Sequence, residues 1–409
     1  MKIYKIPMIG RAVDEKHRAA TPLELFFDLI FVIAIASAAS GLHHYLASHH
    51  FWEGTVLYVQ MFFYIWWAWM NFTWFASAYD TDDTPFRLTT FLQMFGALVF
   101  AVGIKQMFAT NPSFTAGIIG YIIMRVAMVI HWLRAARESA VDKKVNYRYA
   151  WGVGLAQVGW TLWYLLPMAY DDKSWMIPLL TLAEMSVPII AEGNRLSTTW
   201  HPHHIAERYG LLTIIVLGEG LLGTANTIGN LISDEVSWGK VVLPLGVSAS
   251  GLIFALWWIY FDIPWAKILE RNRTFRVGFL FGYAHYFVFA SLAAVGSALE
   301  LVADAAQQYY LPSSTHIEHP VSRLFAMVVL SIALGVYLVS ISLLKITTTE
   351  NSSTNRMALW LGLLVSALPA VLVYFRLPMM VSLGITVLGI IAYIQLCNWE
   401  SCERTIKKR

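Results

Sequence analysis

The sequence predicts an all-α polytopic membrane protein with about twelve transmembrane helices. Of its 409 residues, 57% are hydrophobic and only 13% are charged, about half the charged fraction of a typical soluble domain. The mean hydropathy is +0.56, and a chain this apolar could not cover a soluble surface with polar groups. The sequence also contains many apolar stretches long enough to cross a hydrocarbon core, which takes about 20 residues. We therefore expect the lipid bilayer to be its main partner.

The apolar stretches are separated by short loops, which leave no room for a large domain outside the membrane. In chain order they lie at 22–42, 53–76, 87–109, 113–134, 149–169, 174–192, 207–229, 239–261, 277–300, 321–345, 357–375 and 378–397. The polar segment before the first stretch has no small-residue cleavage site of the kind that follows a secretory signal. We expect the first helix to be retained and to direct insertion.

The Lys and Arg residues indicate how the chain is oriented. With the N-terminus in the cytoplasm, 23 of the 29 Lys and Arg residues fall on the cytoplasmic side and 5 on the opposite side, and Arg125 falls inside a span. Cytoplasmic loops of membrane proteins carry this excess of positive charge. The distribution predicts an even number of spans with both termini in the cytoplasm. Because these charges belong to membrane-flanking loops, we expect no nucleic-acid partner.

Two halves of the sequence resemble each other. The segment WWAWMNFTW at Trp66 matches WWIYFDIPW at Trp257, and the same offset of 191 places Asp28 opposite Glu219. Six spans in each half would give parallel repeats related by an axis along the membrane normal, although a duplication retained for packing alone predicts the same symmetry. The expected parts are a cytoplasmic segment at 1–20, six-helix repeats at 21–200 and 201–400, and a basic cytoplasmic tail at 401–409.

Five ionisable residues fall near the middle of predicted spans, namely Asp28, Arg125, Glu184, Glu219 and His285. A charge at the centre of a bilayer costs about 2.5 to 3.5 kcal/mol. We therefore expect these side chains to converge in the interior as a site for substrate and protons, with Arg125 as counter-ion and His285 modulating protonation. Three carboxylates facing one arginine would leave at least one acid protonated near neutral pH. A static ion pair beside a neutral acid is the structural alternative.

Small residues surround Glu219 in the stretch GEGLLGTANTIGN. Gly218, Gly220, Gly223 and Asn226 are expected to support the central site. Such a density of glycine can loosen a helix beside a carboxylate, as in the discontinuous helices of several transporters. Close packing against another helix through small residues explains the same pattern, and both alternatives stay open.

Charged residues near the cytoplasmic ends of the spans suggest a latch between the two halves. The candidates are Glu24, Asp80, Asp82, Asp83, Arg87, His204, Glu207 and Arg208. The alternative is that these side chains are solvated, since acids in the first turn of a helix favour its positive end without any further role.

Two other patterns have simpler explanations. The histidines at 43, 44, 49 and 50 lack an accompanying cysteine or acidic shell at a settled spacing, so they are interpreted as solvated loop residues and not as metal ligands. The aromatic stripe from Tyr64 to Trp74 is interpreted as interfacial belt and packing, not as a cofactor site.

Three motifs resemble the low temperature requirement protein A family. They are TPLELFFDLIFV at Thr21, YDTDDTPFRL at Tyr79 and HHIAERYGLLTIIVLGE at His203. The resemblance implies a multi-pass protein of the bacterial inner membrane that is linked to growth in the cold. It implies no substrate and no catalytic residue.

The favoured hypothesis is transport of a small solute or ion across the cytoplasmic membrane, coupled to protons through the central charges. A membrane sensor or stress-adaptation protein without transport is the first alternative, and a lipid-modifying enzyme with reactive groups at headgroup depth is the second. We expect no enzyme, cofactor or metal, because the sequence has no nucleophile elbow, phosphate-binding glycine loop, metalloprotease helix or nucleotide fingerprint. The identity of the solute and the oligomeric state are left open.

Overall fold

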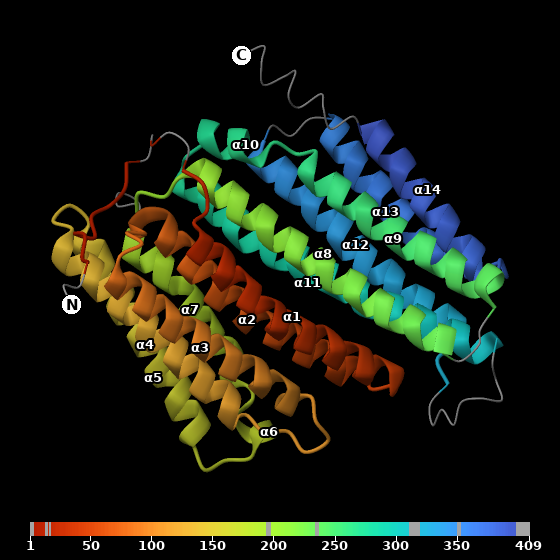
Figure 1. The fold of residues 1–409 in the computed structure, drawn as a ribbon, viewed down its shortest axis with the longest axis horizontal. Helices are drawn as coiled ribbons and strands as arrows, with labels where there is room; N and C mark the ends of the chain where they lie inside the picture. The colour runs from red at the N-terminus through yellow and green to blue at the C-terminus, as the bar shows by residue number, and fades with distance from the viewer. Residues whose placement is uncertain are drawn as a thin grey trace. The chain divides into compact units, whose positions relative to one another are not determined.

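The computed structural model describes residues 4–12, 15, 18–193, 198–233, 237–310, 320–349 and 353–397. Within these ranges the regular secondary structure is helical, as Figure 1 shows. The elements are α1 (Pro22–Ala47), α2 (Phe51–Tyr79), α3 (Thr84–Met107), α4 (Thr115–Glu138), α5 (Lys143–Leu165), α6 (Tyr170–Lys173), α7 (Met176–Glu192), α8 (Pro202–Ser233), the π-helix η1 (Trp238–Val242), α9 (Leu243–Phe261), α10 (Trp265–Arg271), α11 (Phe275–Tyr310), α12 (Arg323–Thr348), α13 (Ser353–Tyr374) and α14 (Met379–Cys397). The predicted basic tail at 401–409 lies outside the described residues.

Each of the twelve predicted stretches contains a helix. In a bilayer a helix satisfies its own backbone hydrogen bonds, so apolar sequence and helical structure go together. Within the described ranges, nine helices are long and apolar enough to cross a membrane, and α2, α5 and α7 are not among them. The all-helical membrane class is thus confirmed, whereas the count of twelve spans stays a prediction.

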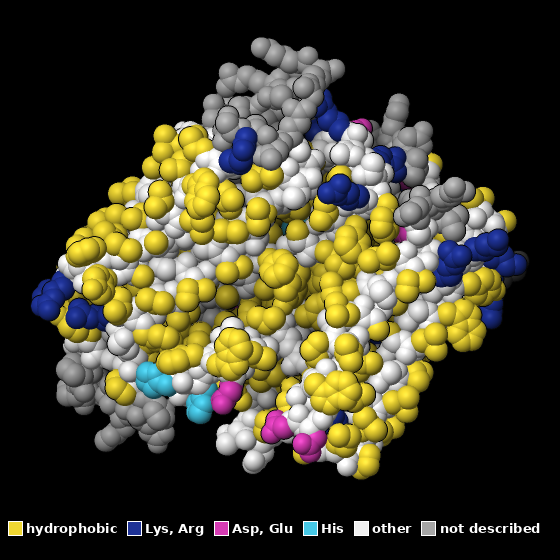
Figure 2. All heavy atoms as spheres, turned by 180° about the vertical axis from the view of Figure 1, so that it is seen from behind, with side chains coloured by type: hydrophobic (Ala, Val, Ile, Leu, Met, Phe, Trp, Pro, Cys, Tyr) yellow, Lys and Arg dark blue, Asp and Glu magenta, His cyan; other side chains and the backbone are white. Residues whose placement is uncertain are grey.

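The exposed side of helix α5 is suited to contact with lipid, although α5 as a whole is less apolar than the nine candidate spans. Trp151, Leu155 and Leu162 follow one side of it, and each is more than half exposed. Its polar residues Asn146 and Gln157 are buried. A helix on the surface of a soluble protein has the opposite arrangement. Figure 2 shows hydrophobic side chains over most of the visible face, with charged side chains at its edges.

The chain forms two compact units. Unit 1 contains Met1–Ser37 and Tyr64–Arg208, and unit 2 contains Ala38–Phe63 and Tyr209–Arg409. Helices α1, α2 and α8 therefore contribute residues to both units. These limits differ from the expected halves, because the second part of α1 and the first part of α2 belong with the C-terminal helices. The relation of two six-helix repeats stays a prediction.

Small residues allow close helix packing inside each unit. In unit 1, α3 packs on α4, α4 on α5 and α5 on α7, and a Cβ atom on Gly103 of α3 would collide with the backbone of Gly117 of α4. In unit 2, Gly220 of α8 lies directly against Gly296 of α11. Helix α8 continues without a break through its glycines. The structure therefore favours the close-packing explanation over a loosened helix.

Candidate functional site

The first two turns of α1 place two carboxylates in the interior of unit 1. The amide of Thr21 donates to Glu24 Oε2 at 2.7 Å, and the amide of Glu24 donates to Thr21 Oγ1 at 3.3 Å. This reciprocal pair is a capping box, which fixes where the helix begins. Asp28 follows Glu24 by four residues and so lies on the same face. Both carboxylates are completely buried.

Arg208 of α8 binds both carboxylates. Its Nε and Nη2 atoms donate to the two oxygens of Asp28, at 3.1 and 2.5 Å. Its Nη1 atom lies 3.1 Å from Glu24 Oε1. Trp69 of α2 donates its indole N–H to Asp28 Oδ1 at 2.6 Å, and the guanidinium also donates to Thr73 Oγ1 at 3.3 Å. Asp28 therefore has a forked, charge-assisted pairing of the kind only arginine provides.

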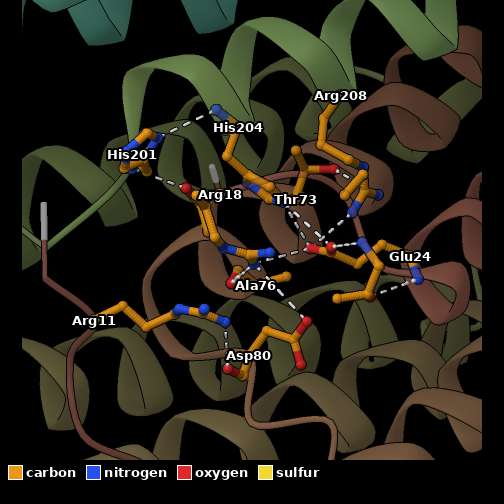
Figure 3. A network of polar contacts seen from close by, with 12 residues as sticks. Arg11, Arg18, Glu24, Thr73, Ala76, Asp80, His201, His204 and Arg208 are labelled. Carbon is orange, nitrogen blue, oxygen red and sulfur yellow. Dashed lines mark hydrogen bonds and ion pairs between the residues drawn. The ribbon is translucent and has the colours of Figure 1, made fainter. Parts of the chain in front are cut away.

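Two further groups complete the cluster around Glu24. His204, one turn before Arg208, places its Nε2 atom 3.0 Å from Glu24 Oε1. Arg18 places its Nη2 atom 3.6 Å from Glu24 Oε1 and 3.8 Å from Asp80 Oδ2. We call this set the buried charge network, and Figure 3 shows it in close-up. Its members are Arg18, Glu24, Asp28, Asp80, His204 and Arg208.

When His204 is neutral, the charges of the buried charge network do not sum to zero. Glu24, Asp28 and Asp80 supply three negative charges when ionised, and the two arginines supply two positive charges. The network becomes neutral when it takes up one proton, on His204 or on a carboxylate. Every member is at most 5% exposed, so an uncompensated charge is costly here. His204 Nδ1 has no hydrogen-bond partner within the described part of the chain.

Asp80 lies just beyond the end of α2, and its environment opposes ionisation. Burial, together with the negative charge of Glu24, raises the pKa of Asp80 to about 6, although Arg18 and the Asp82 amide act in the opposite direction. Burial also lowers the pKa of Arg18. Because the pKa of Asp80 is higher in the folded chain than the usual 3.9 or so, the folded protein takes up this proton at a higher pH than the unfolded chain does. This contribution stabilises the fold progressively as the pH falls through about 6.

The remaining latch candidates lie around the network in separate contacts. Asp83 accepts from Arg134 at 2.8 and 2.5 Å and from the backbone amides of Ile6 and Phe86. Although burial opposes ionisation, these donors lower the pKa of Asp83 to about 2. Asp82 and Arg87 form an exposed pair at 2.7 Å.

Glu207 is also exposed, and its Oε2 atom accepts from the Ala20 amide at 3.0 Å. All eight latch candidates thus belong to unit 1 and not to two halves, and those in the buried charge network tie α1, Asp80 and the start of α8 together.

A second buried ion pair lies elsewhere in unit 1. Arg125 of α4 donates to Glu184 of α7, one of the three carboxylates for which Arg125 is the expected counter-ion. Glu184 also accepts from the indole N–H groups of Trp67 and Trp160, at 2.9 and 2.8 Å. The guanidinium of Arg125 stacks 4.6 Å from the centre of the Tyr121 ring.

The two ion pairs lie on opposite faces of α2. Trp67 donates to Glu184 and Trp69 donates to Asp28, and residues two apart in an α-helix point about 200° apart. Each carboxylate has its own arginine and its own tryptophan. The expected convergence of Asp28, Arg125 and Glu184 on one pocket is therefore not found, because α2 separates the two pairs.

Glu219 and His285 belong to unit 2. Glu219 is only partly buried and lies near Glu300 of α11, while Gly218 and Asn226 of the same helix are exposed. His285 is completely buried among aromatic rings: its Nδ1 faces the Phe281 carbonyl at 2.7 Å and its Nε2 faces the Tyr260 hydroxyl at 3.0 Å. These partners suit a neutral ring that donates to the carbonyl and accepts from the hydroxyl. The contacts of His285 therefore indicate packing, and none of them joins it to a carboxylate.

The motif stretches of the sequence meet in the buried charge network: Glu24 and Asp28 come from the first, Asp80 from the second, and His204 and Arg208 from the third. Residues 19–392 match the family model described as bacterial low temperature requirement A protein (LtrA). The chain belongs to the LtrA family. It is also 28% identical, over 284 residues, to a protein of Rhizobium meliloti (strain 1021) described as uncharacterized, and the match covers 66% of each chain. In this LtrA-family protein every member of the network except Arg18 lies inside the family match.

Two members of this arrangement were missed in the sequence. Arg18 counts in the sequence only as one more basic residue before the first span, yet it is 5% exposed. Trp69 belongs to the aromatic stripe interpreted as interfacial belt and packing, and it is completely buried. The available signal for Trp69 was the pair of indole donors two residues apart on α2, the helix that follows the span carrying Asp28.

Proposed function

We propose that this LtrA-family protein moves a small solute or ion across the bacterial cytoplasmic membrane together with, or in exchange for, protons. The buried charge network carries the proton in this proposal. The observation that supports it most is that three separate motifs, together with Arg18 just before the first of them, bring three carboxylates, two arginines and one histidine together, with one proton needed for neutrality. The Lys and Arg distribution would place this network toward the cytoplasm.

A purely structural role explains the network less well. Burying an ion pair costs several kcal/mol per ion in desolvation, and hydrophobic residues of similar volume often stabilise a fold equally well or better. Ionisable groups within membrane spans are rare and mark ion or proton pathways more often than packing. Because the pKa of Asp80 is raised to about 6, the network would bind and release one proton close to the pH range in which bacteria live.

Proton release from everted membrane vesicles tests the proposal. Respiration acidifies such vesicles, and a pH-sensitive dye then reports proton release when potassium, sodium or calcium chloride, or a mixture of amino acids, is added. Vesicles with the wild-type protein should release protons on addition of at least one of these solutes. Glu24→Gln and Asp28→Asn should reduce the rate at least tenfold, because each removes a carboxylate that sets the charge balance of the network.

Asp82→Asn is the matched control, since it removes a carboxylate from the same region that is exposed and lies outside the network. Its rate should stay within about twofold of the wild type. Protein levels in the membrane are compared for all variants. Wild-type rates in the Glu24→Gln and Asp28→Asn vesicles would contradict the proposal. A wild-type protein that binds one of these solutes without releasing protons would favour a receptor.

A further inference from the structure

A second cluster of ionisable groups lies in unit 2, around the last turns of α1. His43 Nε2 is 2.7 Å from Asp304 Oδ2, and His43 Nδ1 is 3.5 Å from Glu300 Oε2. Both acids come from α11 and lie four residues apart, so they share one face of that helix. The sequence suggested a solvated loop histidine, but α1 extends to Ala47 and holds His43 within the helix.

The geometry around His43 specifies the protonation state in which the contacts are favourable. A neutral imidazole has one N–H donor and one lone pair, whereas a protonated imidazole has two donors. Each ring nitrogen of His43 faces a carboxylate oxygen, so a neutral ring would direct a lone pair at a negative charge. With both acids ionised, the arrangement is complementary only to the protonated ring, which then joins α1 to α11 through two charge-assisted contacts.

A third acid contributes to the same cluster from α8. The side chain of Glu300 lies against Gly223, where any Cβ atom would collide with it. Glu219, one turn earlier on α8, interacts electrostatically with Glu300. The charged groups around His43 are therefore Asp304 and Glu300 of α11, with Glu219 of α8 behind Glu300. The side chains of His43, Glu300 and Asp304 are partly exposed, at 24%, 26% and 29% respectively.

We infer that His43, Glu300 and Asp304 form a proton-binding site that joins α1 to α11 when it is occupied. Histidine is the side chain that changes charge between about pH 5 and 8. Deprotonation removes one donor and leaves Glu300 and Asp304 facing a neutral ring, which weakens the connection. His43 follows Glu24 by 19 residues in α1 (43 − 24), a rise of about 28 Å along the helix. The inference does not depend on transport, because the connection can be measured without any solute.

Hydrogen exchange read by mass spectrometry tests the site on the full-length protein in lipid nanodiscs. Backbone amides of 38–47 and 297–306 are compared at about pH 5.5 and 8.5, after correction for the intrinsic pH dependence of exchange. Wild-type protection in these segments should be roughly tenfold greater at the lower pH, as expected from the loss of a hydrogen bond to a charged group. His43→Gln should show weak protection at both pH values.

Two further variants make the result specific. His43→Lys keeps a fixed positive charge and should retain protection at both pH values. His44→Gln changes the neighbouring, exposed histidine and should behave as the wild type does. If His43→Gln protein is not recovered, Asp304→Asn must abolish the pH dependence in its place. Equal protection of the wild type at both pH values would overturn the inference, as would an unchanged pH response in His43→Gln or Asp304→Asn.

Discussion

Arg208→Met is expected to lower the free energy of unfolding by about 3 to 5 kcal/mol, the cost of leaving a buried partner charge uncompensated. Arg208 supplies two hydrogen bonds to Asp28 and lies 3.1 Å from Glu24. After the substitution, the hydrogen bond that Asp28 keeps from the described residues is that from Trp69. Methionine fills a similar volume, so the effect reports the lost charge and not a cavity. Unfolding of the purified protein in detergent, followed by tryptophan fluorescence, measures the change.

Arg87→Met is the control for this experiment, because it removes an arginine from an exposed carboxylate pair. Its unfolding midpoint should be close to that of the wild type, since exposed ion pairs contribute little. Arg208→Met combined with Asp28→Leu should recover part of the loss, because both members of the pair are then apolar. Equal midpoints for Arg208→Met and Arg87→Met would contradict a buried network.

Arg125→Met should produce the second large loss, about 3 kcal/mol and so at the lower end of the same range. Glu184 then loses its charged partner but still accepts hydrogen bonds from Trp67 and Trp160. Combining Arg125→Met with Glu184→Gln should restore part of the stability, because the side chain at 184 is then neutral and its amide oxygen still accepts from one of the two indoles. The same unfolding assay applies.

The two arginine substitutions also test whether the ion pairs are independent. Because α2 separates them and they share no partner, the two losses should add to within about 0.5 kcal/mol when combined. A double variant that deviates clearly from the sum would indicate that the charges of Asp28 and Glu184 act as one site, which is the arrangement expected from sequence. Glu184→Gln alone should also be destabilising, since it leaves the buried guanidinium of Arg125 without its carboxylate.

The positions of the helices could be predicted from the sequence, because each span must be apolar over a fixed length. The buried acids could also be predicted, since Asp28 and Glu184 lie inside apolar stretches where a lipid-facing charge is costly. That Arg125 pairs with a carboxylate follows from the same cost, although the sequence left open which of the three it would be. These predictions rest on local pattern and on the thickness of the membrane, which do not depend on how the helices pack.

The partner of Asp28 could not be predicted by counting charges within predicted spans. Arg208 was assigned to the cytoplasmic rim, because the seventh predicted stretch begins at residue 207. In the structure α8 begins at Pro202 and α1 at Pro22, so Arg208 and Asp28 each lie six residues into their helix. If the depth of each residue had been counted from the start of its helix, Arg208 and Asp28 would have been placed at the same depth and predicted to pair. His43 was missed for a related reason, since α1 continues five residues beyond the predicted end at 42.

The central claim is that the buried charge network binds and releases a proton near neutral pH, and infrared titration of Asp80 tests it most directly. The carbonyl band of a protonated carboxylic acid is recorded for the purified protein between about pH 4 and 8. The wild type should gain one such band as the pH falls through about 6, and Asp80→Asn should lack it, whereas Asp82→Asn should keep it. A band that is absent in the wild type, or unchanged in Asp80→Asn, would contradict the claim.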